Sequence, residues 1–177
     1  DLPNADCPHT VETWYIPGKS PIRVSQLHRA VALDGVTGRP VCAPYPANVR
    51  MEVFEFWPSD MLRLFRQAGM PRRTPPQLPT CAADGGLEPP RIASPLRNVS
   101  YAVRPAPSGE GITLEATTAA DVRRVFWFDG STLIAARDVA EGAMTWQPTS
   151  AGIHLIRAVD DHGRSAERDV DVQFVNR

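Results

Sequence analysis

DVDVQF (Asp169–Phe174) alternates polar and apolar side chains one by one, and ITLEAT (Ile112–Thr117) does the same. Because successive side chains of a strand point to opposite faces, this period predicts strands with one buried face. Turn-forming pairs separate such runs at Asp129-Gly130, Glu141-Gly142, Ala151-Gly152 and His162-Gly163. Their spacing predicts an immunoglobulin-like antiparallel β-sandwich of about seven strands, with no helix, over residues 89–177.

The tryptophans are either core residues or parts of a binding face. Trp127 has the same strand parity as Val125, so we expect it in the sandwich core. For the adjacent Trp14 and Tyr15 the sequence leaves packing and exposed contact equally open. The four tryptophans could otherwise line a sugar-stacking or partner-binding face.

The first half of the chain predicts a small α+β segment with a hairpin and one short helix. SDMLRLFRQA, residues 59–68, has apolar side chains at helical spacing, with Ser59 suited to the N-cap and Gly69 to the stop. MEVFEFW, Met51–Trp57, reads as a strand. The stretch Asp34–Gly38 has the composition of a hairpin loop.

Residues 74–90 contain prolines and glycines without apolar periodicity, which indicates a linker or a loop draped over a domain. Proline lacks the backbone donor that a helix needs, so no helix is expected there. We place the domain boundary near Glu88. The chain then divides into residues 1–88, a segment that ends in the proline-rich linker, and residues 89–177, the sandwich.

Composition excludes several classes of function. The formal net charge is −1, which gives no bulk attraction to nucleic acid. No apolar run is long enough for a membrane span, so we expect any membrane anchor upstream of residue 1. The cysteines, Cys7, Cys42 and Cys81, lack the spacing of a zinc site.

No motif for catalysis or cofactor binding emerges. The histidines are isolated in sequence, although a triad assembled from distant residues stays open. PGKS, residues 17–20, resembles the end of a phosphate-binding loop, but Thr13 stands where that motif needs glycine. Asp160 and Asp161 precede His162-Gly163, where carboxylates commonly stabilise a turn. We predict no catalytic, metal or cofactor residues.

Longer strings resemble a known family. CPHTVETWYIPGKSPIRVSQLHR (residues 7–29) and EFWPSDMLRLFRQAGMPRRTPP (residues 55–76) resemble the segment after the transpeptidase domain of type-1C bifunctional class A penicillin-binding proteins. PPRIASPL (residues 89–96) and VRRVFWFDGSTL (residues 122–133) resemble the C-terminal domain appended there. The resemblance implies a periplasmic, inner-membrane-anchored peptidoglycan synthase with glycosyltransferase and transpeptidase activities.

Those activities do not carry over to this chain. Ser20-Pro-Ile-Arg23 ends in arginine where a transpeptidase needs the lysine of SxxK, and no KTG motif occurs. The resemblance therefore implies a non-catalytic C-terminal accessory module that docks a protein partner. Its own transpeptidase domain and a bacterial α-2-macroglobulin are the candidate partners.

Direct peptidoglycan binding is the alternative function. In that case exposed aromatics would stack on sugar rings, and arginines would contact peptide carboxylates. The candidate contact residues are Trp14, Tyr15, Arg72 and Arg73, with Arg91 as a further arginine.

The export implied by the resemblance supplies an oxidising setting, in which two of the three cysteines are expected to pair. We favour a disulfide between Cys42 and Cys81, because a proline-rich loop gains most from a covalent anchor. Pairing of Cys7 with Cys42 is the second choice.

Overall fold

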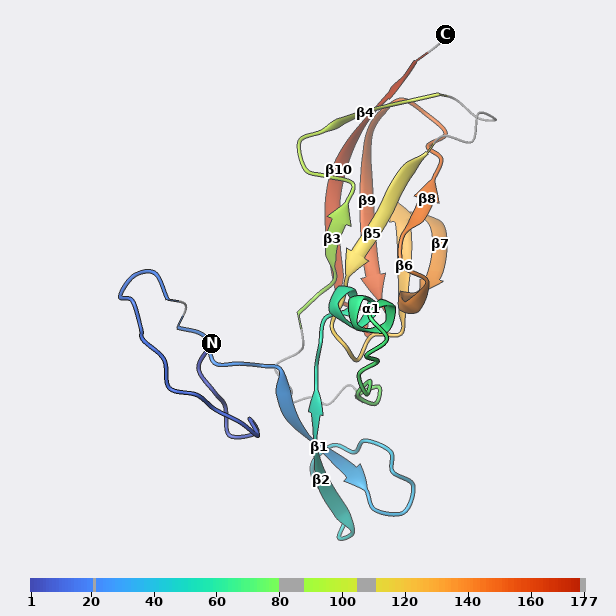
Figure 1. The fold of residues 1–177 in the computed structure, drawn as a ribbon. Helices are drawn as coiled ribbons and strands as arrows, with labels where there is room; N and C mark the ends of the chain where they lie inside the picture. Colours follow the sequence, from blue (N-terminus) through green and yellow to red (C-terminus); the bar gives the residue numbers. More distant parts are fainter. Residues whose placement is uncertain (21, 80–87, 105–110, 176–177) are drawn as a thin grey trace.

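Two β-sheets pack face to face in the second half of the chain (Figure 1). The computed structural model describes residues 1–20, 22–79, 88–104 and 111–175. The larger sheet has the strand order β4 (Ser100–Val103), β10 (Ser165–Phe174), β9 (Gly152–Asp160), β6 (Arg124–Asp129) and β7 (Thr132–Asp138). The smaller sheet has the order β3 (Arg91–Ser94), β5 (Ile112–Thr117) and β8 (Met144–Trp146). The chain is therefore mainly β with the predicted sandwich.

The sandwich differs from the prediction in two details of its strands. All paired strands are antiparallel except β10 and β4, which run parallel from the Asp171–Ser100 pair to the Phe174–Val103 pair. In addition, β8 is a separate three-residue strand that pairs with β5. The described part of the chain thus has eight strands in the sandwich rather than about seven.

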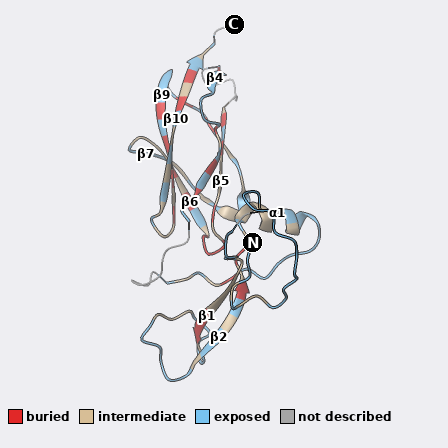
Figure 2. Ribbon diagram, turned by 90° about the vertical axis from the view of Figure 1, so that its left-hand side faces the viewer, coloured by how far each residue is buried: buried red, intermediate tan, exposed pale blue. Residues whose placement is uncertain are grey.

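The core of the sandwich follows the alternation seen in the sequence. Leu114 and Val170 are fully buried, and Val172 is 1% exposed. Trp127 is 3% exposed and packs in the same cluster, so its predicted place in the core is confirmed. Figure 2 shows buried residues alternating with exposed ones along β9 and β10. One strand face therefore supplies the apolar burial that stabilises the domain.

The strand connections use the turn residues that the sequence indicated. Gly130 and Gly163 adopt the left-handed conformation that glycine favours, with φ of 56° and 79°. The Asp160 carboxylate accepts the backbone N–H groups of His162 at 3.0 Å and Arg164 at 2.9 Å. The expectation that a carboxylate stabilises this turn is confirmed for Asp160.

The prediction of no helix after residue 89 was wrong. A short 3-10 helix, η1 (Val139–Glu141), follows β7, and Gly142 ends it with φ of 77°. Arg137 and Glu141 form an ion pair at 2.8 Å across this turn. The Glu141-Gly142 pair was read as a simple turn because three residues are too few to show a helical period.

The first half forms a hairpin with a small core. Strands β1 (His28–Asp34) and β2 (Val49–Glu55) pair antiparallel along seven residues each. Val31, Leu33, Phe54 and Phe56 are buried there, together with Ala120 from the sandwich. Because one member of this cluster comes from the sandwich, the hairpin core is completed by the second half of the chain.

The predicted loop at Asp34–Gly38 is a tight turn. The Asp34 carboxylate accepts the backbone N–H and hydroxyl of Thr37 and the backbone N–H of Val36. The hydrogen bond from the Thr37 backbone, followed by the bond from its hydroxyl, lowers the pKa of Asp34 from its ordinary value of 3.8. The main partner of β1 is nevertheless β2, since only the Leu33–Pro40 bridge forms directly beyond this turn.

Helix α1 (Ser59–Gln67) lies against one end of the sandwich (Figure 1). Gly69 follows the helix with φ of 71°, the left-handed conformation that commonly ends a helix, so its predicted role is confirmed. The assignment of Ser59 as N-cap was wrong, because the cap residue is Pro58 and makes no side-chain bond. The Ser59 hydroxyl instead accepts the backbone N–H of Thr118 in the sandwich.

Residues 1–20 and 22–27 form a long loop beside β1, at the left of Figure 1. Asn4 donates to the carbonyls of Ser25 at 2.9 Å and His28 at 2.7 Å, and Asp6 accepts the backbone N–H of Ala30. These side-chain bonds fasten one end of the loop to β1. No helix among the described residues is long and apolar enough to cross a membrane.

Candidate interaction surfaces

Hydrogen bonds and an ion pair join helix α1 to the sandwich. Ser59 and Thr118 exchange two bonds of 3.0 Å each, one from each backbone N–H. One helical turn later, Arg63 donates to the Glu115 carboxylate on β5 at 2.7 Å. Since Arg63 and Glu115 are only about one-third exposed, the ion pair is partly shielded from water.

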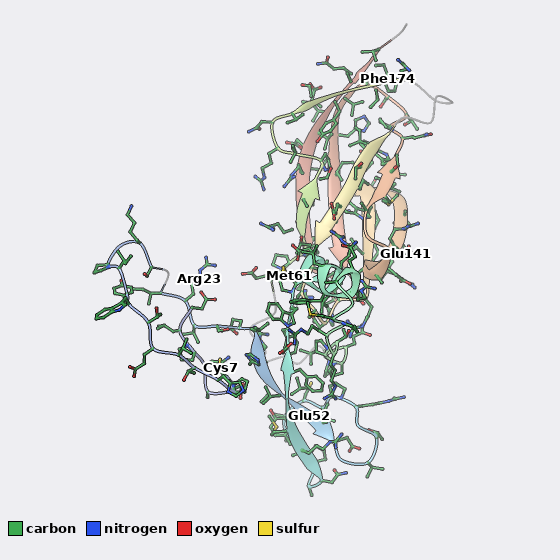
Figure 3. All side chains as sticks on the ribbon, in the orientation of Figure 1. Cys7, Arg23, Glu52, Met61, Glu141 and Phe174 are labelled. Carbon is green, nitrogen blue, oxygen red and sulfur yellow. The ribbon has the colours of Figure 1, made fainter. Side chains whose placement is uncertain are left out.

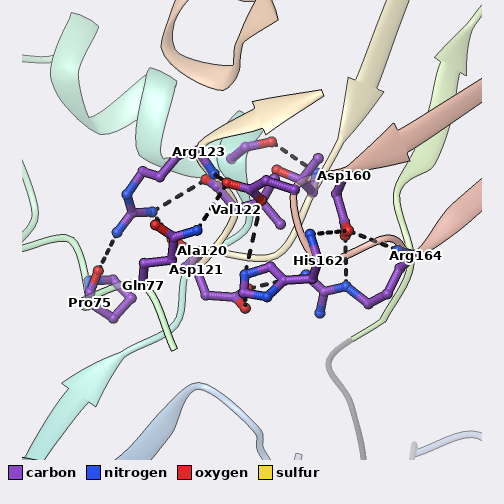
Figure 4. Close-up of polar contacts among 12 residues, drawn as sticks. Pro75, Gln77, Ala120, Asp121, Val122, Arg123, Asp160, His162 and Arg164 are labelled. Carbon is purple, nitrogen blue, oxygen red and sulfur yellow. Dashed lines mark hydrogen bonds and ion pairs between the residues drawn. The ribbon is translucent and has the colours of Figure 1, made fainter. Parts of the chain in front are cut away.

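The start of the proline-rich segment is draped over the sandwich rather than extended as a linker. The Arg123 guanidinium donates to the carbonyls of Pro75 and Ala120 (Figure 4). Gln77 donates to the Asp161 carboxylate at 3.3 Å. These bonds join residues 75–77 to the end of the sandwich, so the loop interpretation holds for this part. The rest of the predicted boundary region, residues 80–87, lies outside the described residues.

A buried charged cluster lies beside this contact (Figure 4). Asp121 is 3% exposed, and its carboxylate lies 3.1 Å from His162 Nε2 and 3.5 Å from the Arg164 guanidinium. Arg164 Nε also donates to the Asp160 carboxylate at 2.6 Å. Arg164 from the β9–β10 turn is thus an ion-pair partner of both carboxylates. This cluster fixes the turn against the β5–β6 connection, and it forms no group of metal ligands among the described residues.

Arg168 on β10 makes another internal contact. Its guanidinium donates to the carbonyls of Ile92 and Pro95, which fastens β3 to β10. Burial, followed by repulsion from Arg97, lowers the pKa of Arg168 below its ordinary value. Arg168 therefore serves the sandwich itself and is not offered to a ligand.

A pocket of about 360 Å³ lies where α1 meets the sandwich. Its apolar wall consists of Leu62, Ala119, Ala120, Val122, Val139 and Ala140. Its polar lining consists of Ser59, Arg66, Arg72, Thr74, Arg123 and Asp138. The pocket thus combines residues from α1, from the segment after it, from the β5–β6 connection and from η1.

The two arginines predicted as contact residues have different surroundings. Arg73 pairs with Glu52 and lies 4.3 Å from the centre of the Phe54 ring, so it fastens residue 73 to the hairpin. Arg72 lies over the Phe65 ring at 5.0 Å and lines the pocket. Contact of either arginine with a ligand stays a prediction. Arg66, which sequence reasoning did not single out, is the other exposed arginine of the pocket.

Trp14 and Tyr15 lie in the N-terminal loop, the part of the chain that carries Cys7 and Arg23 in Figure 3. The Trp14 side chain is 95% exposed and Tyr15 is 52% exposed. Other large apolar residues of this loop are also exposed. We call the set the N-terminal apolar segment, which consists of Val11, Trp14, Tyr15, Ile16, Ile22 and Val24.

The other tryptophans are packed inside the chain. Trp146 is 6% exposed and belongs to the sandwich core with Trp127. Trp57 packs edge to face against Phe65 at 5.1 Å, and its Nε1 donates to the Glu55 carboxylate at 2.7 Å. Trp14, in the N-terminal apolar segment, is therefore the exposed member of the four tryptophans.

The His154 side chain contacts Ser150, an exposed residue, and Asp129, which is distant in the sequence. His154 Nδ1 lies 2.7 Å from Asp129 Oδ2, and Nε2 lies 3.5 Å from the Ser150 hydroxyl. However, Nε2 is closer, at 3.0 Å, to the Ser150 carbonyl oxygen, which can only accept a hydrogen. A nucleophilic serine needs this nitrogen as its base. The arrangement instead holds the loop between β8 and β9 to the end of β6.

The cysteine predictions are tested only in part. Cys7 is a free cysteine, and its thiol donates to Asn4 Oδ1 at 3.3 Å, so its second-choice pairing with Cys42 is not formed. Cys42 is half-buried after the first hairpin turn. Cys81 lies outside the described residues, and the Cys42–Cys81 disulfide stays a prediction.

Comparison with known proteins adds two matches. Residues 79–174 match the penicillin-binding protein C-terminus family. Among solved structures, a fibronectin(III)-like module of Clostridium thermocellum CbhA is similar, with 24% sequence identity and a TM-score of 0.38. That similarity covers 50% of this chain and 98% of the module. No curated protein sequence matches.

The family match indicates a non-catalytic module of a penicillin-binding protein, and hence an extracytoplasmic setting. The matched residues contain all eight strands of the sandwich. They also make up more than half of the 177 residues. This chain therefore belongs to the penicillin-binding protein C-terminus family.

Proposed function

We propose that this chain is a non-catalytic accessory module that docks proteins onto a periplasmic peptidoglycan synthase. The observation that carries the proposal is the exposure of the N-terminal apolar segment, above all of Trp14 at 95%. Exposed apolar residues gathered in one segment are typical of a protein-binding surface. Tryptophan contributes more to protein interfaces than most residues, because it buries a large rigid area.

The transpeptidase domain of the same synthase is the first partner proposed. Residues 7–29 resemble the segment that follows such a domain, and they contain the whole N-terminal apolar segment. Side-chain bonds from Asn4 and Asp6 to β1 hold the loop to the rest of the chain. A docked loop would thereby orient the sandwich relative to the synthase. A bacterial α-2-macroglobulin is the candidate for a second protein partner.

Direct peptidoglycan binding is the alternative, and sedimentation with purified sacculi separates it from protein docking. The proposal predicts that the chain stays in the supernatant at low salt and binds purified transpeptidase domain. Replacement of Trp14 by alanine should weaken that binding at least about tenfold, as expected for a central interface tryptophan. Cosedimentation with sacculi without binding to either candidate protein would contradict protein docking and favour the alternative.

A further inference from the structure

The pocket between α1 and the sandwich lies apart from the N-terminal apolar segment and has the features of a small-ligand site. Its volume of about 360 Å³ is near the lower end of ligand sites, which commonly have about 300–1,000 Å³. A site of this size admits a group of one or two residues. It is too small for an α-helix or for a folded loop of a partner.

The charge of the pocket favours an anion. Three guanidinium groups line it, and Asp138 is its one lining carboxylate. Asp138 already accepts a bond from Arg124 Nε at 3.1 Å, which offsets its charge. Arg66 and Arg72 have no carboxylate partner in the described part of the chain. Both side chains are therefore available to a negatively charged ligand.

The wall of the pocket favours a small aliphatic group beside that anion. Ala119, Ala120 and Ala140 leave space that larger side chains would fill. The rest of the apolar lining consists of Leu62, Val122 and Val139. A bare inorganic anion would leave this apolar wall in contact with water. A ligand that joins a carboxylate to a methyl or similar group would satisfy both parts.

We propose that this pocket binds the free carboxylate end of a short peptide whose last side chain is small and aliphatic. The planar guanidinium groups of Arg66 and Arg72 match the two oxygens of a carboxylate. The last side chain lies against Ala119 and Val139. This function goes beyond protein docking and does not depend on Trp14.

The test is a titration of the intact isotope-labelled chain with N-acetyl-alanyl-alanine, followed by amide NMR shifts. The expected result is saturable shifts at Ala119, Val139 and Ala140. The same dipeptide with a C-terminal amide should bind at least about tenfold more weakly, because it lacks the charge-assisted bonds. Absence of saturable shifts up to the solubility limit, or equal binding of acid and amide, would overturn the proposal.

Variants assign the binding to the pocket. Arg66→Gln and Arg72→Gln should each weaken acid binding about tenfold, whereas Arg39→Gln, at an exposed arginine in the loop after β1, should leave it unchanged. Ala140→Leu should block the pocket without removing a charge. Circular dichroism melting confirms that each variant is folded. Equal loss in all three arginine variants would show a general charge effect and overturn the assignment.

The two enantiomers of the dipeptide identify the source of the ligand. Saturable, carboxylate-dependent binding of either one supports the proposal. Tighter binding of the D-alanyl-D-alanine form assigns the peptide to the cell wall. Tighter binding of the L form assigns it to the C terminus of a protein. Because these titrations use no protein partner, their failure leaves the docking proposal standing, and failure of docking leaves the pocket standing.

Discussion

Ser59 and Thr118 exchange two hydrogen bonds of 3.0 Å between the start of α1 and the end of β5, and so join the two halves of the chain. Thr118 is 3% exposed, so its backbone N–H has no easy access to water once the Ser59 hydroxyl is removed. The pair therefore stabilises both the helix position and the domain contact.

Ser59→Ala should lower the free energy of unfolding by about 1–3 kcal/mol, the cost of a buried donor without a partner. Urea unfolding followed by tryptophan fluorescence measures this change. Ser131→Ala, in the exposed turn between β6 and β7, is the matched control and should change stability by less than about 0.5 kcal/mol. Equal stability of the two variants would show that the bond contributes nothing.

Trp127 and Trp14 form a second matched pair, with 3% and 95% of the residue exposed. Trp127→Ala should destabilise the chain by about 3–5 kcal/mol, because it leaves a large cavity in the sandwich core. Trp14→Ala should change stability by less than about 0.5 kcal/mol. Thermal melting of both variants is the measurement. A large loss in Trp14→Ala would mean that this residue packs within the chain and is not offered to a partner.

Residues 89–177 should fold alone, and residues 1–88 should not. Every buried member of the sandwich cluster lies between Ile92 and Val172, whereas the hairpin cluster needs Ala120 from the sandwich. Expression of each segment, with calorimetry of the product, tests the asymmetry. A cooperative melt of residues 1–88, or none for residues 89–177, would refute it.

Thiol counting should find one reactive thiol in protein produced in the periplasm and denatured without reductant. The free thiol is Cys7, and the predicted disulfide joins Cys42 to Cys81. Closing a loop of about 40 residues stabilises a chain by a few kcal/mol in the chain-entropy model, so reduction should lower the melting temperature. Three reactive thiols would contradict the prediction. In that case the Cys7→Ser variant would still show two reactive thiols, those of Cys42 and Cys81.

The sequence predicted those features that depend on local pattern. The alternation around Val170 and Leu114 was enough to identify strands, since the period of a strand is visible within six residues. The bond between Ser59 and Thr118 and the pairing of His154 with Asp129 were not predictable, because each joins elements far apart in sequence.

The features of the candidate sites likewise depended on contacts that the sequence does not show. The exposure of Trp14 was left open by the sequence, because a single apolar residue in a loop has no period that shows which side it faces. The pocket was missed because four segments build it, and Arg66 looked like an ordinary surface residue of an amphipathic helix. Arg73 was grouped with Arg72, yet only a folded chain shows that Arg73 is bound to Glu52.

The affinity of the intact chain for the purified transpeptidase domain of its synthase, with and without the Trp14→Ala and Tyr15→Ala substitutions, tests the central proposal most directly. Isothermal titration calorimetry is the measurement, and Arg91→Gln is the control for an exposed residue outside the segment. Protein docking predicts saturable binding by the unaltered chain, a loss of at least about tenfold in the double variant, and no change in the control. Binding that is absent, or equally strong in the double variant, would contradict docking through the N-terminal apolar segment.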